Sequence, residues 1–224
     1  MNPHASRVTP ELVAAVEREL GDVETRLTEA PGHATALARS RATRRISVGR
    51  ANGRRFTFSA GVGLDAELVR ETDRVRRSEG RRPGDLTWVA TLARLLASRG
   101  GRLPPALTVL GRGRAAFALV ANCDPYTYAG LLPLHVAPSA RFELGLDLVA
   151  PVELRPARLA HAAYAVLLHP THVRAPWVIH VHDADELRIE CDAPTPLQAD
   201  GEDLGDVVDA HFVAERAALE VVVR

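Results

Sequence analysis

The C-terminal stretch 178–223 constrains the fold most, because it is a succession of short runs of strand-forming residues. The runs are VIHVH, ELRIEC, PLQA, HFVA and LEVVV, and their spacing is typical of an antiparallel meander. A second strong signal is Asn52-Gly53, which separates the strand-like segments 44–48 and 54–59. Asn-Gly accepts the two positive-φ positions of a type I′ turn, so this pair predicts a β-hairpin. A mainly antiparallel sheet is therefore expected over most of the chain.

Helical periodicity appears in other segments, where apolar residues recur on one face. The clearest case begins at Leu64, which shares a face with Leu68 and Val75. The expected helices are 10–20, 32–39, 86–97 and 157–168, together with the one that runs from Leu64 to a break at 80–84. The further strands expected are 22–27, 103–109, 115–122 and 134–137. The sequence thus predicts an α+β protein: a small α/β piece at 1–43 followed by a larger antiparallel domain at 44–224.

Composition excludes several function classes. The 28 basic residues balance the 28 acidic ones, which argues against a nucleic-acid partner. All the basic residues are Arg, so neither a Schiff-base lysine nor the Walker A lysine is present. The two cysteines, Cys123 and Cys191, are far apart in the sequence. This spacing favours a protein of a reducing compartment and argues against a structural zinc site. With no long apolar run and no signal-peptide pattern, we expect a soluble cytoplasmic protein whose only membrane contact is peripheral, at the inner face.

Three short patterns carry candidate chemistry. On a strand, His180 and His182 would share a face and could chelate zinc or iron. The competing interpretation, a solvent-facing strand that Asp183 and Asp185 end, is favoured because no third ligand has a diagnostic spacing. The segment 61–63, Gly-Val-Gly, could place an anion at a helix N-terminus, and close backbone packing explains it equally well.

The third pattern is Asp200-Gly201-Glu202, in which a glycine separates two carboxylates at a tight turn. Such a pair could deprotonate a hydroxyl or hold a divalent cation. On spacing alone, an exposed Asp-Gly hairpin turn is the favoured interpretation.

These segments together resemble the second domain of bacterial diacylglycerol kinases and sphingosine-kinase-like lipid kinases, in an actinobacterial style. The segments that carry the resemblance are 52–66, 117–130, 134–140, 142–148 and the 200–202 turn. Their order and spacing match the family from about residue 44 to the end. The resemblance implies a β-sandwich-like α+β lipid-kinase domain and an ATP-dependent phosphorylation of a lipid hydroxyl, such as that of diacylglycerol.

The resemblance also implies roles for single residues. Glu202 would be the general base that takes the hydroxyl proton, with Asp200 beside it. The lipid cleft would be lined by Asp65, Asn122 and Tyr126. Leu144 stands where many relatives carry an aspartate of a magnesium site, which leaves Glu143 and Asp147 as the candidate metal ligands.

The segment 1–43 resembles a truncated remnant of the NAD-kinase/diacylglycerol-kinase-like nucleotide domain. Its Asn2 and Thr28 match family positions near the nucleotide and are the candidate cofactor-binding residues. After Arg39, however, the chain passes directly into the predicted hairpin, and no Gly-Gly-Asp-Gly-Thr phosphate loop occurs. Because that loop lets backbone N–H groups approach the ATP phosphates, we expect impaired catalysis.

The cofactors that the resemblance implies are ATP and Mg²⁺, and the partner is a lipid with a free hydroxyl; a homodimer is compatible with it. Two alternatives stay open. The chain is either a non-catalytic lipid-binding or regulatory module, or an active lipid kinase that a partner chain completes.

Overall fold

The computed structural model describes residues 30, 43–79, 85–129, 132–168 and 170–222. The chain divides into two units, Met1–Arg45 with Glu220–Arg224, and Ile46–Leu219. Most of the described residues belong to the second unit. The helices predicted at 10–20 and 32–39, the strand at 22–27, and the candidate residues Asn2 and Thr28 all lie outside the described residues.

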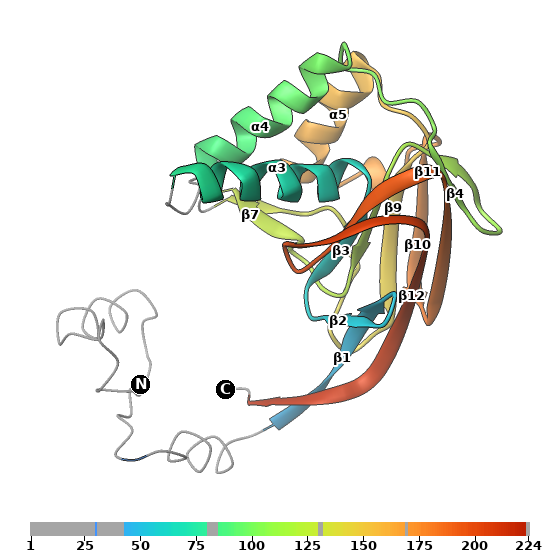
Figure 1. The fold of residues 1–224 in the computed structure, drawn as a ribbon. Coiled ribbons are helices and arrows are strands. Elements are labelled where there is room, and N and C mark those ends of the chain that lie inside the picture. The colour runs from blue at the N-terminus through green and yellow to red at the C-terminus, as the bar shows by residue number, and fades with distance from the viewer. Residues whose placement is uncertain (1–29, 31–42, 80–84, 130–131, 169, 223–224) are drawn as a thin grey trace. The chain divides into compact units, whose positions relative to one another are not determined.

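A large antiparallel sheet dominates the unit (Figure 1), and its strand order is β10-β9-β6-β3-β11-β12-β1-β2, with β4 pairing with β11 and β5. The strands are β1 (Thr43–Ala51), β2 (Arg54–Phe56), β3 (Ser59–Val62), β4 (Leu107–Val109), β5 (Gly113–Ala115), β6 (Ala118–Ala121), β9 (Leu146–Pro151), β10 (Val178–Ala184), β11 (Glu186–Ala199) and β12 (Glu202–Val222). A separate hairpin pairs β7 (Thr127–Ala129) with β8 (Leu132–Leu134).

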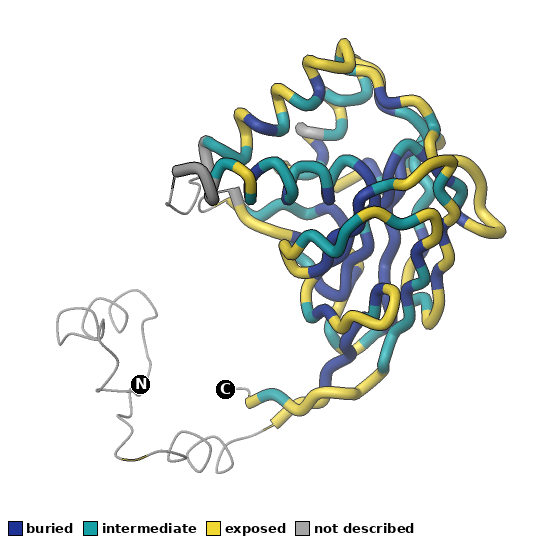
Figure 2. The backbone as a smooth tube through the Cα atoms, in the orientation of Figure 1, coloured by how far each residue is buried: buried dark blue, intermediate teal, exposed yellow. Residues whose placement is uncertain are grey.

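Three helices, α3 (Leu64–Glu79), α4 (Asp85–Ser98) and α5 (Pro156–Leu167), group together on one side of the sheet (Figure 1). A 3₁₀ turn, η1 (His172–Arg174), follows α5. Figure 2 shows the buried residues concentrated in the strands. The largest core cluster includes the fully covered side chains Phe56, Leu107, Ile189, Leu197 and Phe212. The predicted α+β class is confirmed.

Two tight turns set the register of the sheet. Asn52 (φ 45°) and Gly53 (φ 88°) join β1 to β2, which confirms the predicted type I′ hairpin. Asp200 (φ 48°) and Gly201 (φ 78°) join β11 to β12 in the same way, with Ala199 opposite Glu202. The Asn52 side chain also accepts from His211 N (2.7 Å) and donates to Asp209 O (3.0 Å), so the first turn is bound to β12.

The predicted strand lengths are wrong in four places. The C-terminal runs merge into three long strands, because β11 pairs with β4 along its first half and with β3 along its second half. The predicted strand 103–109 shortens to β4, since Pro104 and Pro105 lack the N–H groups that a central strand donates. The predicted strand 115–122 divides into β5 and β6, and 134–137 contributes only Leu134, the last residue of β8.

Candidate functional site

Three strand ends meet at one edge of the sheet. Strand β3 lies between β6 and β11, and its first residues, Ser59 and Ala60, face Ala121 and Ala199. Because the pairing is antiparallel, the beginning of β3 adjoins the ends of the other two strands. This edge therefore brings together segments that are far apart in sequence: residues 57–59, the loop after β6, and the Asp200-Gly201 turn.

The Asp200 carboxylate is bound to the backbone of the neighbouring segment. It accepts hydrogen bonds from the N–H groups of Thr57 (2.6 Å), Phe58 (2.8 Å) and Ser59 (3.1 Å). Hydrogen bonds to an ionised acceptor are stronger than neutral ones, so Asp200 fixes the turn against residues 57–59.

Glu202 has a different environment, although only one residue separates it from Asp200. Its carboxylate accepts from Arg54 Nη2 at 2.6 Å, and its side chain is 63% exposed. The turn presents one carboxylate to the backbone and the other to the surface. The sequence prediction placed both acids at one rim, and the structure assigns them separate partners.

A buried residue that the sequence prediction missed, Gln198, links this turn to Asp65. Its side-chain oxygen accepts from Gly201 N (3.0 Å), and its amide nitrogen donates to Asp65 Oδ2 (2.6 Å). Tyr126 donates its hydroxyl to the same oxygen (2.9 Å). Asp65 and Tyr126, which resemblance assigned to a lipid cleft, thus belong to one network with the Asp200 turn. The signal for Gln198 was a single polar residue inside the apolar run PLQA.

Burial changes the acidity of this network. Burial raises the pKa of Asp65, and the hydrogen bonds from Gln198 and Tyr126 oppose that rise. Burial also raises the pKa of Tyr126 well above its ordinary value, and the nearby Asp65 carboxylate adds to the increase. Tyr126 is therefore a donor here, and Asp65 holds its proton more strongly than an exposed carboxyl would.

The close approach of Asp65 explains one of the two glycines at 61–63. A Cβ atom at Gly61 would lie 2.2 Å from Asp65 Oδ2. Of the two interpretations of this segment, close packing accounts for Gly61 without an anion.

Asn122 is fully buried at the same edge. Its amide nitrogen donates to the carbonyls of Ser47 (2.9 Å) and Thr57 (2.8 Å), and its backbone N–H donates to Phe58 O (2.9 Å). Asn122 thus binds carbonyl groups of the segment whose N–H groups Asp200 binds. In this position Asn122 supports the segment that Asp200 clamps.

The two candidate metal ligands differ in exposure, since Glu143 is exposed and Asp147 is fully buried. Asp147 Oδ1 accepts from His182 Nδ1 (2.8 Å) and Asp183 N (3.0 Å). Its Oδ2 faces His180 Nε2 at 3.9 Å, and neither atom has a hydrogen-bond partner. Magnesium prefers oxygen ligands, so these surroundings of Asp147 do not fit a Mg²⁺ site.

The acids that end β10 are engaged by one arginine. Arg216 contacts Asp183 Oδ1 (2.8 Å) and Asp185 Oδ1 (2.6 Å). Within the described ranges, no three His, Cys, Asp or Glu side chains are arranged to hold a metal ion. Both acids therefore contact the same guanidinium group at the end of β10.

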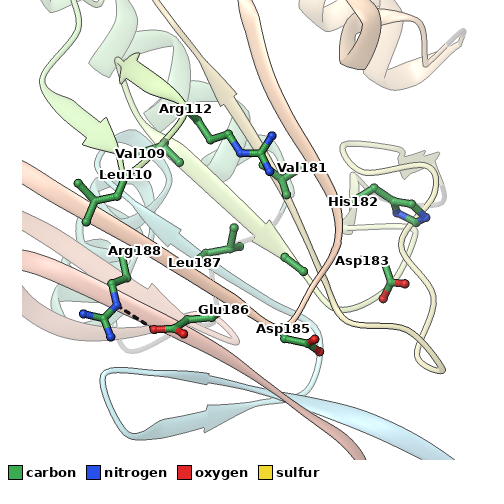
Figure 3. Close-up of a pocket in the computed structure, with 11 residues that line it drawn as sticks. Val109, Leu110, Arg112, Val181, His182, Asp183, Asp185, Glu186, Leu187 and Arg188 are labelled. Carbon is green, nitrogen blue, oxygen red and sulfur yellow. Dashed lines mark hydrogen bonds and ion pairs between the residues drawn. The ribbon is translucent and has the colours of Figure 1, made fainter.

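A groove of about 670 Å³ lies elsewhere on the sheet, between β4 and the β10–β11 turn (Figure 3). The Arg188–Glu186 ion pair (2.8 Å) lies in it. Its lining residues are Val109, Leu110, Arg112, Val181, His182, Asp183, Ala184, Asp185, Glu186, Leu187 and Arg188. The groove is lined by His182, one of the two candidate chelating histidines, and by none of the site residues that the family resemblance assigned.

We expect Asp65→Asn to stabilise the protein more at neutral than at acidic pH. Burial raises the pKa of Asp65 in the folded protein, so the protonated carboxyl contributes to the stability of the fold. This contribution is lost as the pH rises from the pKa of Asp65 in the unfolded chain through its pKa in the folded protein. The neutral amide avoids that loss. Thermal unfolding of both proteins between pH 4 and pH 8 checks this expectation. A melting-temperature difference that is constant with pH would contradict it.

The geometry defines an antiparallel α+β sandwich-like domain with a carboxylate-bearing hairpin turn at one sheet edge. Residues 58–223 match the family model of the YegS C-terminal NAD kinase beta sandwich-like domain, and the chain belongs to that family. The matched range includes both the Asp200-Gly201-Glu202 turn and the network of Asp65, Tyr126 and Gln198.

Solved structures share this fold. Two structures from Bacillus anthracis str. Sterne, provisionally described as diacylglycerol kinases, superpose with TM-scores of 0.56 and 0.54 at 16% and 17% identity. Each match covers 86% of this chain and 61% of the other, so the chain spans about three fifths of their length. No curated protein matches. None of the described helices is long and apolar enough to cross a membrane.

Proposed function

We propose that this chain is the lipid-binding half of a diacylglycerol-kinase-like lipid kinase, and that it transfers no phosphate by itself. The ancestral reaction is the ATP-dependent phosphorylation of a lipid hydroxyl. Family membership and the shared fold of the diacylglycerol-kinase structures support this assignment.

The turn at residues 200–202 is the observation that carries the proposal. A general base must reach the hydroxyl proton, so it has to be accessible and held in place. Glu202 is accessible, and the bonds of Asp200 to residues 57–59 fix the turn that carries it. Glu202 is therefore the group that takes the proton from the lipid hydroxyl.

The proposed protein differs from an intact kinase in its nucleotide-binding part. Phosphoryl transfer depends on positioning and charge stabilisation around the phosphates. The sequence contains neither a Gly-Gly-Asp-Gly-Thr loop nor any Lys, and the surroundings of Asp147 do not fit Mg²⁺. The proposed role of the described residues is therefore confined to the lipid hydroxyl.

Calorimetric titration with Mg-ATP tests the first part of the proposal, and negligible heat is expected. Vesicles that contain diacylglycerol should likewise give no phosphorylated lipid with this chain alone. Lipid phosphorylation by the chain alone would favour the alternative of an active kinase with an unusual nucleotide site.

The role of Glu202 is tested by adding the nucleotide-binding domain of a diacylglycerol kinase as a separate polypeptide. We expect lipid phosphorylation that requires both chains and that Glu202→Gln lowers about a hundredfold or more, as for loss of a general base. Glu190→Gln is the matched control, because Glu190 is an exposed acid on β11 outside the turn. Full activity of Glu202→Gln would remove the general base from the mechanism. Diacylglycerol binding without phosphorylation would favour the lipid-binding module.

A further inference from the structure

The residue that follows Glu202 in the chain, Asp203, is held by an arginine of α3. Arg70 donates to both oxygens of the Asp203 carboxylate, from Nε to Oδ2 (2.7 Å) and from Nη2 to Oδ1 (2.9 Å). Its third nitrogen, Nη1, contacts Asp206 Oδ1 at 2.7 Å. Asp203 Oδ1 also accepts from Gly205 N (3.0 Å). The guanidinium group thus engages two carboxylates of β12 with all three nitrogens, in a forked geometry that a lysine cannot reproduce.

The Arg70–Asp203 ion pair is better shielded from water than the Arg54–Glu202 pair beside it. The side chains of Arg70 and Asp203 are 23% and 24% exposed, whereas those of Arg54 and Glu202 are 57% and 63% exposed. Water and salt weaken partly buried ion pairs less than exposed ones. The hydrogen bonds from Arg70 also lower the pKa of Asp203. Of these two ion pairs, the one with Arg70 therefore holds the start of β12 more firmly.

The same helix also holds the residue that precedes Glu202. Asp65 accepts a hydrogen bond from Gln198, and the side-chain oxygen of Gln198 accepts from Gly201 N. Gln198 lies directly opposite Asp203 in the pairing of β11 with β12, so the two side chains share the face of the hairpin that binds α3. Because side chains alternate along a strand, Glu202 projects from the other face. Helix α3 therefore fixes both sequence neighbours of Glu202.

We propose that Arg70 is a positioning residue for Glu202. The inference rests on the proposed function, in which Glu202 takes the proton of the lipid hydroxyl. A general base acts only within hydrogen-bond reach of that proton, and a small displacement of a reacting group removes a large part of the rate. Loss of the Arg70 bonds would release one of the two neighbours that α3 holds. The Glu202 carboxylate would remain, but it would spend less time in the reactive position.

Nitrogen-15 NMR relaxation of the whole chain alone tests whether Arg70 holds the turn. We expect Arg70→Gln to lower the backbone order parameters of residues 201–203 from about 0.85 to about 0.6 or less. Asp203→Asn removes the same ion pair from its other partner and should give the same local loss. Arg74→Gln is the matched control, because the ion pair of Arg74 with Glu71 lies within α3. Order parameters in Arg70→Gln equal to those of the control would overturn the proposal, and circular dichroism checks that all variants are folded.

The lipid phosphorylation assay with the added nucleotide-binding domain tests whether this hold matters for the reaction. We expect Arg70→Gln to lower kcat about tenfold or more and to leave KM for diacylglycerol unchanged, because the placement of the base changes and lipid binding does not. Arg70→Lys should show the same loss, since a lysine offers a single nitrogen where the arginine offers three. Arg74→Gln should keep both constants.

An unchanged kcat in Arg70→Gln, full activity of Arg70→Lys, or an equal loss in Arg74→Gln would overturn the proposal. A failure of the proposed function gives a different result. If Glu202→Gln keeps full activity, or if the two chains together phosphorylate no lipid, the role assigned to Glu202 fails. The order parameters measured on the chain alone then still decide whether Arg70 holds the backbone of Glu202.

Discussion

Gly61→Ala is expected to destabilise the protein by roughly 3 kcal/mol, because overpacking and the loss of buried hydrogen bonds add together. The new methyl group would lie 2.2 Å from Asp65 Oδ2 and 2.9 Å from Asp65 Cβ, so rotation of the carboxylate alone cannot relieve the clash. Moving the Asp65 side chain would also break its bonds to Gln198 and Tyr126. Urea unfolding measures the loss.

A double-mutant cycle separates this clash from a general effect of alanine in β3. Asp65→Ala removes the atoms that the methyl group meets, so Gly61→Ala should cost much less in that background than in the unmodified protein. If the cost of Gly61→Ala is the same in both backgrounds, the clash with Asp65 is not its cause. The cycle also measures how strongly β3 is coupled to the first turn of α3.

Phe56→Ala should cost about 3–5 kcal/mol, the range for removing a buried aromatic side chain. Phe56 is 1% exposed, and its ring lies where a Cβ atom of the opposite Gly49 would be, 2.1 Å from Phe56 Cζ. The missing side chain at Gly49 lets the ring lie on the strand backbone. Truncation would leave a cavity between β1, β2 and the core.

Phe58 provides the matched control for Phe56. It lies two residues further along the chain and is 55% exposed, with an edge-on contact to Phe142 at 6.1 Å between ring centroids. We expect Phe58→Ala to cost about 1 kcal/mol or less. Urea unfolding measures the loss of stability in both alanine variants. Similar losses would contradict the expectation that the difference in burial sets the cost.

The parts of the fold that the sequence could predict depend on local chemistry. The turn at Asn52-Gly53 follows from the residues that tolerate positive φ, and the helix beginning at Leu64 follows from its periodicity. The length of β11 does not follow from local signals, because different partners pair with its two halves. The apolar run that forms β9 was not predicted as a strand, although all six of its residues are buried.

The candidate site shows the same division. The Asp200-Gly201-Glu202 turn was visible in the sequence, because two acids flank a glycine there. The role of Gln198 was not visible in the sequence, because its partner Asp65 lies 133 residues away in the chain. The separate environments of Asp200 and Glu202 also depend on tertiary partners, the backbone of residues 57–59 and the Arg54 side chain.

The hairpin turn joins one carboxylate whose partners are backbone groups to another whose partner is a single exposed side chain. Arg54 and Glu202 are 57% and 63% exposed, so water and salt weaken their attraction. A ligand that approaches Glu202 competes with one guanidinium group and leaves the bonds of Asp200 in place. Glu202 can therefore exchange its partner without a rearrangement of the sheet edge, and the ionic strength of the solution sets how readily that exchange takes place.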